Sequence, residues 1–382
     1  MSTVFKARVE AFDAALAEDV INDDNLRKLC FAGVPEGKGR RALAWRLLLN
    51  FLPMKKGTWN DFLHQQRQLY AQLIDEMVLQ PQSSKKCEDH PLNPNPNSQW
   101  QSFFKDNDVL LQIDKDVRRL CPDISFFSQA TDFPNKKIGS GQYERLHQRV
   151  QQTSLKSQNL ERKGLGIAKL SLLKKKASEN YAPLAKGQEA HWEVVQRILF
   201  LYAKLNPGQS YVQGMNEIIG PIYYVFASDP NNEWKEHAEA DCFFCFTNLM
   251  ADIRDFFIKT LDEAESGING MMLRFMRKIK YIDSKVEARL VDQDIKPQYF
   301  SFRWLTLMLS QEFALPDVLR IWDSVLSDKT RSDFLIDVCT AMVLLIREDI
   351  LTNDFAENMK LLQNFPPMDI HVILSKAAAL SS

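Results

Sequence analysis

The chain has 382 residues, of which 45% are hydrophobic and 25% charged, so it can bury the core of one large domain or two modest ones. Its 48 basic and 49 acidic side chains nearly cancel, which excludes a general nucleic-acid-binding surface because such a surface needs a strong basic excess. Six cysteines scattered over so long a chain predict no disulfide framework and favour a reducing compartment.

Neither a membrane span nor a secretion signal is expected. No stretch of the sequence is both long and apolar enough to cross a bilayer. The first seventeen residues interrupt their apolar positions with Lys6, Arg8, Glu10 and Asp13, whereas a signal peptide needs an unbroken apolar stretch. The sequence therefore predicts a cytoplasmic protein that reaches membranes only by peripheral recruitment.

Apolar residues recur at helical spacing along most of the chain. The spacing predicts helices over residues 5–16, 41–52, 60–79, 108–120 and 191–205, and further helices from 215 to the end. Prolines and asparagines in 80–97 predict a loop there. Alternation typical of strands and a repeat of fixed length are both missing from the sequence, so the predicted fold is all-α and non-repeating.

The stretch 130–188 differs from its surroundings. It is rich in Lys, Arg, Gln and Ser, and it carries about eight more basic than acidic side chains. One interpretation is a solvated, loop-rich insertion. The other is an electrostatic contact with an acidic partner or with an anionic membrane face, centred on the run Lys174–Lys176.

The first candidate for chemistry is Ile113–Arg119, which reads I-x-x-D-x-x-R. On a helix, one apolar stripe of this segment should face the core: Leu110, Ile113, Val117 and Leu120. Asp116 and Arg119 fall on a neighbouring polar stripe and can meet, whereas Arg118 points away and can pair with Asp114. The alternative is an ordinary solvated ion pair that contributes little.

The second candidate is Tyr211–Gly214, which reads Y-x-Q-G and lies in the turn between two predicted helices. A glutamine at such a turn can present its amide outward, and Gly214 allows another backbone to approach closely. The alternative is a local capping hydrogen bond from Gln213.

Other motifs carry less weight. Gly33–Gly39 reads G-V-P-E-G-K-G, which lacks the Ser or Thr of a phosphate-binding loop and is better interpreted as a turn. Cys242 and Cys245 form a single C-x-x-C among phenylalanines, which favours core packing over zinc because a structural zinc site needs four ligands. The histidines form no metal-protease spacing and no triad. We therefore expect no metal site and no cofactor bound by this chain itself.

Four motifs in order resemble those of TBC domains. Arg41 to Leu49 reads R-x-x-x-W-x-x-L-L, like the opening motif of that family. The two candidates above resemble its second and third motifs. A fourth set of residues resembles the family's C-terminal signature: Trp304, Leu315-Pro316 and Arg320-Ile321-Trp322-Asp323. The resemblance spans about residues 33–326.

The resemblance implies an all-α, V-shaped, non-repeating TBC domain that acts as a GTPase-activating protein for Rab-type small GTPases in vesicle trafficking. Arg119 would be an arginine finger and Gln213 a glutamine finger that aligns the attacking water. Asp116 would orient Arg119, and Tyr211 and Gly214 would shape the turn. Arg41 and Trp45 are interpreted as structural residues. An alternative for Arg41 is a contact that connects it to the finger region.

Several expectations follow from the same resemblance. The partner is a GTP-bound Rab, which carries the GTP and Mg²⁺, and the protein is a monomer with no substrate turnover of its own, hence not an enzyme but an activator in trans. The basic insertion would add a peripheral membrane contact. The alternative is a catalytically silent TBC-fold module that only binds a Rab or a trafficking complex; such members lose the arginine or the glutamine, whereas this chain keeps both.

The expected domain organisation has an N-terminal helix in 1–32, which precedes or packs on a TBC domain in 33–382, with the basic insertion at about 130–188. Arg119 and Gln213 are much farther apart in sequence than the fingers of compact TBC domains, and the insertion accounts for the difference.

Overall fold

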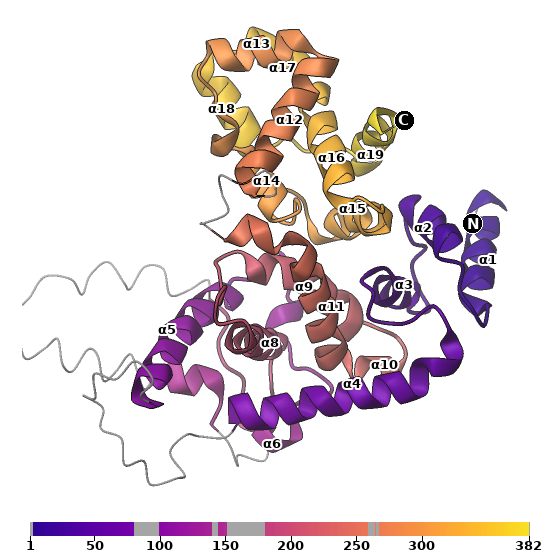
Figure 1. Cartoon of the computed structure of the whole chain (residues 1–382), viewed down its shortest axis with the longest axis vertical. Coiled ribbons are helices and arrows are strands. Elements are labelled where there is room, and N and C mark those ends of the chain that lie inside the picture. The colour runs from indigo at the N-terminus through magenta and orange to yellow at the C-terminus, as the bar shows by residue number, and fades with distance from the viewer. Residues whose placement is uncertain are drawn as a thin grey trace, which may run out of the picture. The chain divides into compact units, whose positions relative to one another are not determined.

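The computed structural model describes residues 3–79, 99–139, 144–150, 180–258, 264 and 267–381. The structure is 70% helical, and in the described ranges the only strand-like pairings are two isolated bridges, Val20 with Lys55 and Ala130 with Ala190. The predicted all-α class is confirmed (Figure 1). The predicted loop over 80–97 lies outside the described residues.

The chain divides into two compact units. Unit 1 comprises Met1–Asp61, Asp229–Asn231 and Phe244–Ser382, and unit 2 comprises Phe62–Ser228 and Asn232–Phe243. The first two helices pack on each other and on further helices of unit 1, and the expected division after residue 32 stays a prediction.

Unit 1 begins with three helices, α1 (Thr3–Ala17), α2 (Asp23–Phe31) and α3 (Arg40–Leu48). Its C-terminal helices are α12 (Ile268–Ile282), α13 (Ser284–Asp292), α14 (Ser301–Thr306), α15 (Leu315–Ser327), α16 (Arg331–Leu345), α17 (Arg347–Thr352), α18 (Phe355–Gln363) and α19 (Ile370–Leu380). In Figure 1, α16 and α19 run side by side, and α2 packs on α15. The N-terminal stretch therefore holds two helices where one was predicted. The side chain of Asn22 caps the second, accepting a hydrogen bond from the Asn25 N–H.

Unit 2 is built around one buried helix. Its helices are α4 (Trp59–Ile74), α5 (Gln99–Val117), α6 (Lys136–Gly139), α8 (His191–Leu205), α9 (Met215–Ala227) and α10 (Asn232–Lys235), and α11 (Ala238–Ile253) begins here and continues into unit 1. Every residue from His191 to Ala203 is buried, as expected for a helix that is covered on all sides. Figure 1 shows α8 end-on among α4, α5 and α9.

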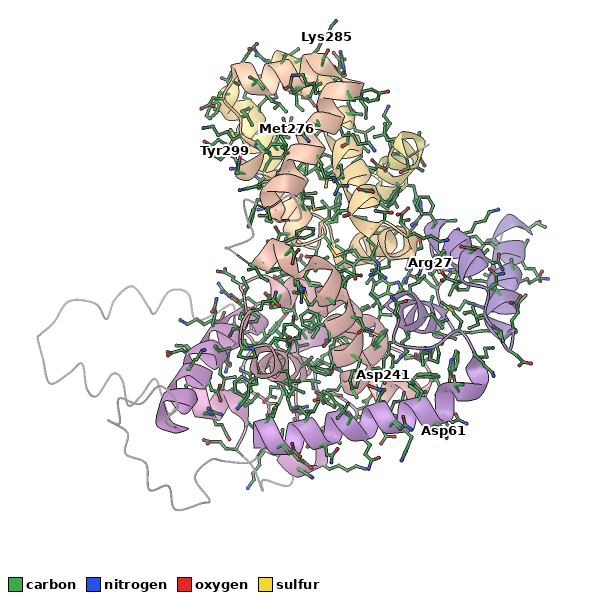
Figure 2. All side chains as sticks on the ribbon, viewed as in Figure 1. Arg27, Asp61, Asp241, Met276, Lys285 and Tyr299 are labelled. Atoms are coloured by element: carbon green, nitrogen blue, oxygen red, sulfur yellow. The ribbon has the colours of Figure 1, made fainter. Side chains whose placement is uncertain are left out.

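Buried charges in unit 2 are paired, which removes most of the cost of taking them out of water. Arg197 of α8 donates to Glu189 and to Glu239. The fully buried Asp241 (Figure 2) accepts two hydrogen bonds from Arg67 at 3.0 Å each. These pairs fix α4, α8 and α11 to one another inside the unit and so support the helices that carry the candidate site.

His191, at the start of α8, predicts a pH-dependent stability. Its Nδ1 lies 2.8 Å from the Tyr223 hydroxyl, and its ring stacks on Phe126 at 4.1 Å between centroids. Burial, helped by Lys235 and opposed by Asp132, lowers the pKa of His191 to about 4. Between that value and the pKa of about 6.5 in the unfolded chain, the unfolded state binds more protons, so stability present above pH 6.5 is lost as the pH falls toward 4.

We expect the His191 contribution to unfolding free energy to fall by about 2 kcal/mol between pH 7 and pH 5, from a pKa shift worth about 1.4 kcal/mol per unit. Urea unfolding at the two pH values measures it. His191→Gln should remove this part of the pH dependence, and His371→Gln, at an exposed position, should leave it in place. Equal pH dependence of wild type and His191→Gln would contradict the assignment.

Candidate functional site

The candidate site begins at the C-terminal end of α5. Four apolar side chains on this segment, Leu110, Ile113, Val117 and Leu120, are fully buried, which confirms the predicted stripe. The helix ends at Val117 and not at Leu120, because the next backbone hydrogen bonds span three residues, as in a 3₁₀ turn. The Arg119 N–H donates to the Asp116 carbonyl, and the Leu120 N–H donates to the Val117 carbonyl. Cys121 then adopts a left-handed conformation with φ of 45° and turns the chain away.

The two neighbouring arginines in this turn have different environments. The side chain of Arg118 is 12% exposed: its Nε donates to Asp114 at 2.8 Å, and its guanidinium lies 4.5 Å from the centre of the Trp192 ring. The side chain of Arg119 is 58% exposed, with Nε donating to the Lys115 carbonyl at 3.0 Å and Nη2 lying 3.4 Å from Asp116 Oδ1. Arg118 is therefore held by the fold, whereas the Arg119 guanidinium is open to a partner.

A buried hydrogen bond connects this turn to the second motif. The Tyr211 hydroxyl donates to Asp116 Oδ2 at 2.8 Å, across 95 positions of sequence, and lies 3.3 Å from Asn216 Oδ1. Both Tyr211 and Asp116 are buried. Burial, and then the Asp116 carboxylate, raises the pKa of Tyr211, so its phenol remains a donor at neutral pH. The bond holds the end of α5, which precedes Arg119, against the turn before α9.

The turn before α9 presents Gln213. Gly214 is the N-cap of α9 with φ of 104°, a left-handed conformation that favours glycine. The Gln213 side chain is exposed, and across the described part of the chain nothing accepts from or donates to its amide. The alternative of a capping bond from Gln213 is thus not observed: Gly214 caps α9 with no side-chain bond.

Arg41 and Trp45, the other two predicted supporting residues, lie in unit 1 and meet the C-terminal signature there. Arg41 Nε and Nη2 each donate to Asp323 at 3.1 Å, Trp45 Nε1 donates to it at 2.9 Å, and so does the Val34 N–H at 2.9 Å. Asp323 is fully buried, and the Trp45 and Trp322 rings lie 5.9 Å apart. The first and last motifs of the sequence therefore form one structural cluster, and its centre, Asp323, carried no predicted role.

The weaker motifs lie in a turn and in the core. Gly33 and Gly39 both have positive φ, and a Cβ on Gly33 would lie 2.6 Å from Arg320 Nε, which fits the predicted turn. Cys242 and Cys245 are fully buried in α11. Among the described residues, no group of three or more potential metal ligands is found, and no helix is long and apolar enough to cross a membrane.

The ends of the basic stretch pack on unit 2. Ile138, Leu146 and Val150 are buried, and Ala130 pairs with Ala190 in a bridge. Residues 140–143 and 151–179, including Lys174–Lys176, lie outside the described residues. The predicted electrostatic contact of this stretch therefore stays a prediction.

Comparison with known proteins assigns the family. The family model described as Rab-GTPase-TBC domain (RabGAP-TBC) matches residues 141–351, which include Gln213; Arg119 precedes that range. The chain is 54% identical to TBC1 domain family member 13 of Homo sapiens, over all of this chain and 99% of the other. It is 34% identical to TBC domain-containing protein C1952.17c of Schizosaccharomyces pombe, over 97% of this chain and 72% of that protein.

The fold has a solved counterpart. The crystal structure of the Ypt/Rab-GAP domain of Gyp1p matches 99% of this chain and 98% of its own, with a TM-score of 0.69. Sequence identity over that match is 22%, so it shows the fold alone. The TBC fold expected from the four motifs is confirmed.

The comparisons also correct one expectation and settle the family. The prediction that the protein is not an enzyme is wrong, because the matched family consists of GTPase-activating enzymes. A protein that stabilises the transition state of a reaction is a catalyst even when its partner holds the nucleotide. The family model covers more than half of the chain, and the human relative matches it from end to end. The chain belongs to the Rab-GTPase-TBC domain family of Rab GTPase-activating proteins.

Proposed function

We propose that this protein accelerates GTP hydrolysis by a Rab-family small GTPase by supplying Arg119 and Gln213 in trans. The observation that carries the proposal is the buried Tyr211–Asp116 hydrogen bond. It joins the turn that carries the exposed Arg119 to the turn that carries the exposed Gln213, which supports a site made of both side chains.

The chemistry follows from what each side chain can donate or accept. A guanidinium presents its N–H donors and a permanent charge to phosphate oxygens, where negative charge accumulates as the bond to the γ-phosphoryl breaks. An amide both donates and accepts, so Gln213 can hold an attacking water and a phosphate oxygen at once. In this mechanism the GTP and Mg²⁺ belong to the GTPase, and the chain contributes no cofactor of its own.

Asp116 has the role of a positioning residue for Arg119. Its Oδ2 is occupied by the Tyr211 hydroxyl, which leaves Oδ1 directed at the Arg119 guanidinium 3.4 Å away. A contact of this length restricts the rotamers of the arginine and still lets it move onto a partner. Tyr211 and Gly214 act indirectly. Tyr211 holds Asp116 in position, and Gly214 shapes the turn that carries Gln213.

The partner and setting are proposed from the family. The family model and the human relative support a Rab GTPase as the partner, and we propose that its GTP-bound form is recognised by a monomer of this protein. Action on Rabs implies a role in vesicle trafficking, with the protein in the cytoplasm and peripherally recruited to membranes. The basic stretch at 130–188 is the proposed source of that membrane contact.

The test is a panel of GTP-loaded Rab proteins, each incubated with the full-length protein while phosphate release is followed. At least one Rab should hydrolyse GTP faster in proportion to the protein added. If the protein binds GTP-loaded Rabs and accelerates none of them, the silent binding module is the correct reading.

Gln213→Ala is expected to lower the stimulated rate by about a hundredfold, the usual cost of removing one transition-state hydrogen-bonding group. The loss should persist with a Rab that keeps its own glutamine, because Gln213 would hold the water in its place. Phosphate release under single turnover measures it. Gln129→Ala, at an exposed glutamine of unit 2 whose side chain bonds only Ser125 in the described structure, is the matched control. A full rate for Gln213→Ala would mean that the GTPase positions its own water.

A further inference from the structure

The carbonyl groups around Arg119 share one partner. Beyond the end of α5 the backbone carbonyls have no helical partner and must find one elsewhere. The Tyr181 N–H donates to the Arg118 carbonyl at 3.0 Å. The Tyr181 hydroxyl donates to the Leu120 carbonyl at 2.8 Å and lies 3.2 Å from the Cys121 carbonyl. Tyr181 therefore holds the backbone on both sides of Arg119.

Tyr181 is itself held in place. Arg118 Nη1 donates to the Tyr181 carbonyl at 2.8 Å, which makes the contact reciprocal. The same guanidinium is fixed by Asp114 and by the face of Trp192. Asp114 in turn accepts a hydrogen bond from the buried Gln196 of α8 at 2.8 Å. The reciprocal contact between Arg118 and Tyr181 is thus connected, through Asp114, to the central helix of unit 2.

Arg119 needs such support because its own side chain has little. It is more than half exposed, and its only described side-chain contacts are with the Lys115 carbonyl and, at 3.4 Å, with Asp116. An exposed arginine samples many rotamers, so the direction in which it extends depends on where its backbone is fixed. The residues that fix this backbone therefore contribute to catalysis without touching the nucleotide.

We propose that Tyr181 is a positioning residue for the Arg119 finger, holding the finger turn through the carbonyl groups of Arg118, Leu120 and Cys121. This inference rests on the proposed function, since it presumes that Arg119 is the catalytic arginine. Burial raises the pKa of Tyr181 to about 12, so the hydroxyl remains a donor throughout the physiological range. Tyr181 belongs to the stretch 130–188, so the end of that stretch serves the site directly.

The decisive variant is Tyr181→Phe, which removes the hydroxyl and keeps the ring and the backbone bond. With the Rab that responds best in the panel, kcat should fall about fivefold, the kinetic equivalent of one hydrogen bond, and KM should not change. Tyr70→Phe removes a tyrosine hydroxyl bond of the same unit, to Glu239, and should leave kcat unchanged. An unchanged kcat in Tyr181→Phe, or a change confined to KM, would overturn the proposal.

A double variant separates positioning from a general effect on the fold. In the Arg119→Ala background, Tyr181→Phe should cause no further loss, because there is no finger left to position. A further fivefold loss there would overturn the positioning role even if the single variant behaves as expected. Failure of the proposed function is detected separately, by Arg119→Ala alone retaining full activity.

Discussion

Arg119→Ala is expected to lower stimulated GTP hydrolysis by about 10³–10⁵-fold, the range that an arginine supplied in trans contributes. The side chain is 58% exposed and reaches a buried residue only at Asp116, 3.4 Å away, so its removal should leave the thermal unfolding midpoint close to that of wild type. Single-turnover phosphate release from a GTP-loaded Rab measures the loss. Binding of the variant to the same Rab should persist, which separates lost chemistry from lost recognition.

Two further variants sharpen this result. Arg119→Lys keeps a charge but loses the planar fork that fits phosphate oxygens, so it should recover only a small part of the rate. Arg118→Ala should instead destabilise the fold, because its guanidinium bonds Asp114 and the Tyr181 carbonyl and stacks on Trp192. If Arg119→Ala is as active as wild type, the finger assignment is wrong.

The parts of the fold that could be predicted from the sequence are those determined by local periodicity. The buried stripe of α5 followed from spacing alone, because residues three and four apart share one face of a helix. The start of α5 at Gln99 was not predicted, although Trp100, Phe103 and Phe104 already recur at helical spacing. The grouping of segments such as 1–61 and 244–382 into one unit did not follow from the sequence either, because it depends on long-range packing.

The same distinction holds at the site. The pairing of Asp116 with Arg119 is a local, three-residue relation and was predictable, as was the separate pairing of Arg118 with Asp114. The Tyr211–Asp116 bond joins residues 95 positions apart, and no periodic pattern encodes such a contact. Tyr181 was missed for a related reason: it lies in a polar stretch that was interpreted as an insertion, with no local signal that it returns to α5.

The contacts of Asp323 join the first and the last sequence motifs. Four donors surround its carboxylate: two guanidinium nitrogens of Arg41, the indole N–H of Trp45 and the backbone N–H of Val34. Burial raises the pKa of Asp323, and the Arg41 guanidinium opposes that shift. The charge is therefore tolerated in the interior only because these donors replace water. This explains why arginine, tryptophan and aspartate occur together in motifs almost 300 positions apart.

Asp323→Ala is accordingly expected to destabilise the protein by about 3–5 kcal/mol, because it leaves the mostly buried Arg41 charge and two N–H donors without their acceptor. Urea unfolding followed by tryptophan fluorescence measures it, since the Trp45 indole bonds the carboxylate and the Trp322 ring lies 5.9 Å from the Trp45 ring. In an Arg41→Met background the same substitution should cost clearly less, because no cation is left unpaired. Glu10→Ala breaks an exposed pair with Lys6 at 4.0 Å and should change stability by less than about 0.5 kcal/mol. Equal costs for Asp323→Ala with and without Arg41 would show that the carboxylate stabilises unit 1 through Trp45 and Val34, and that the arginine of the first motif is retained for another reason.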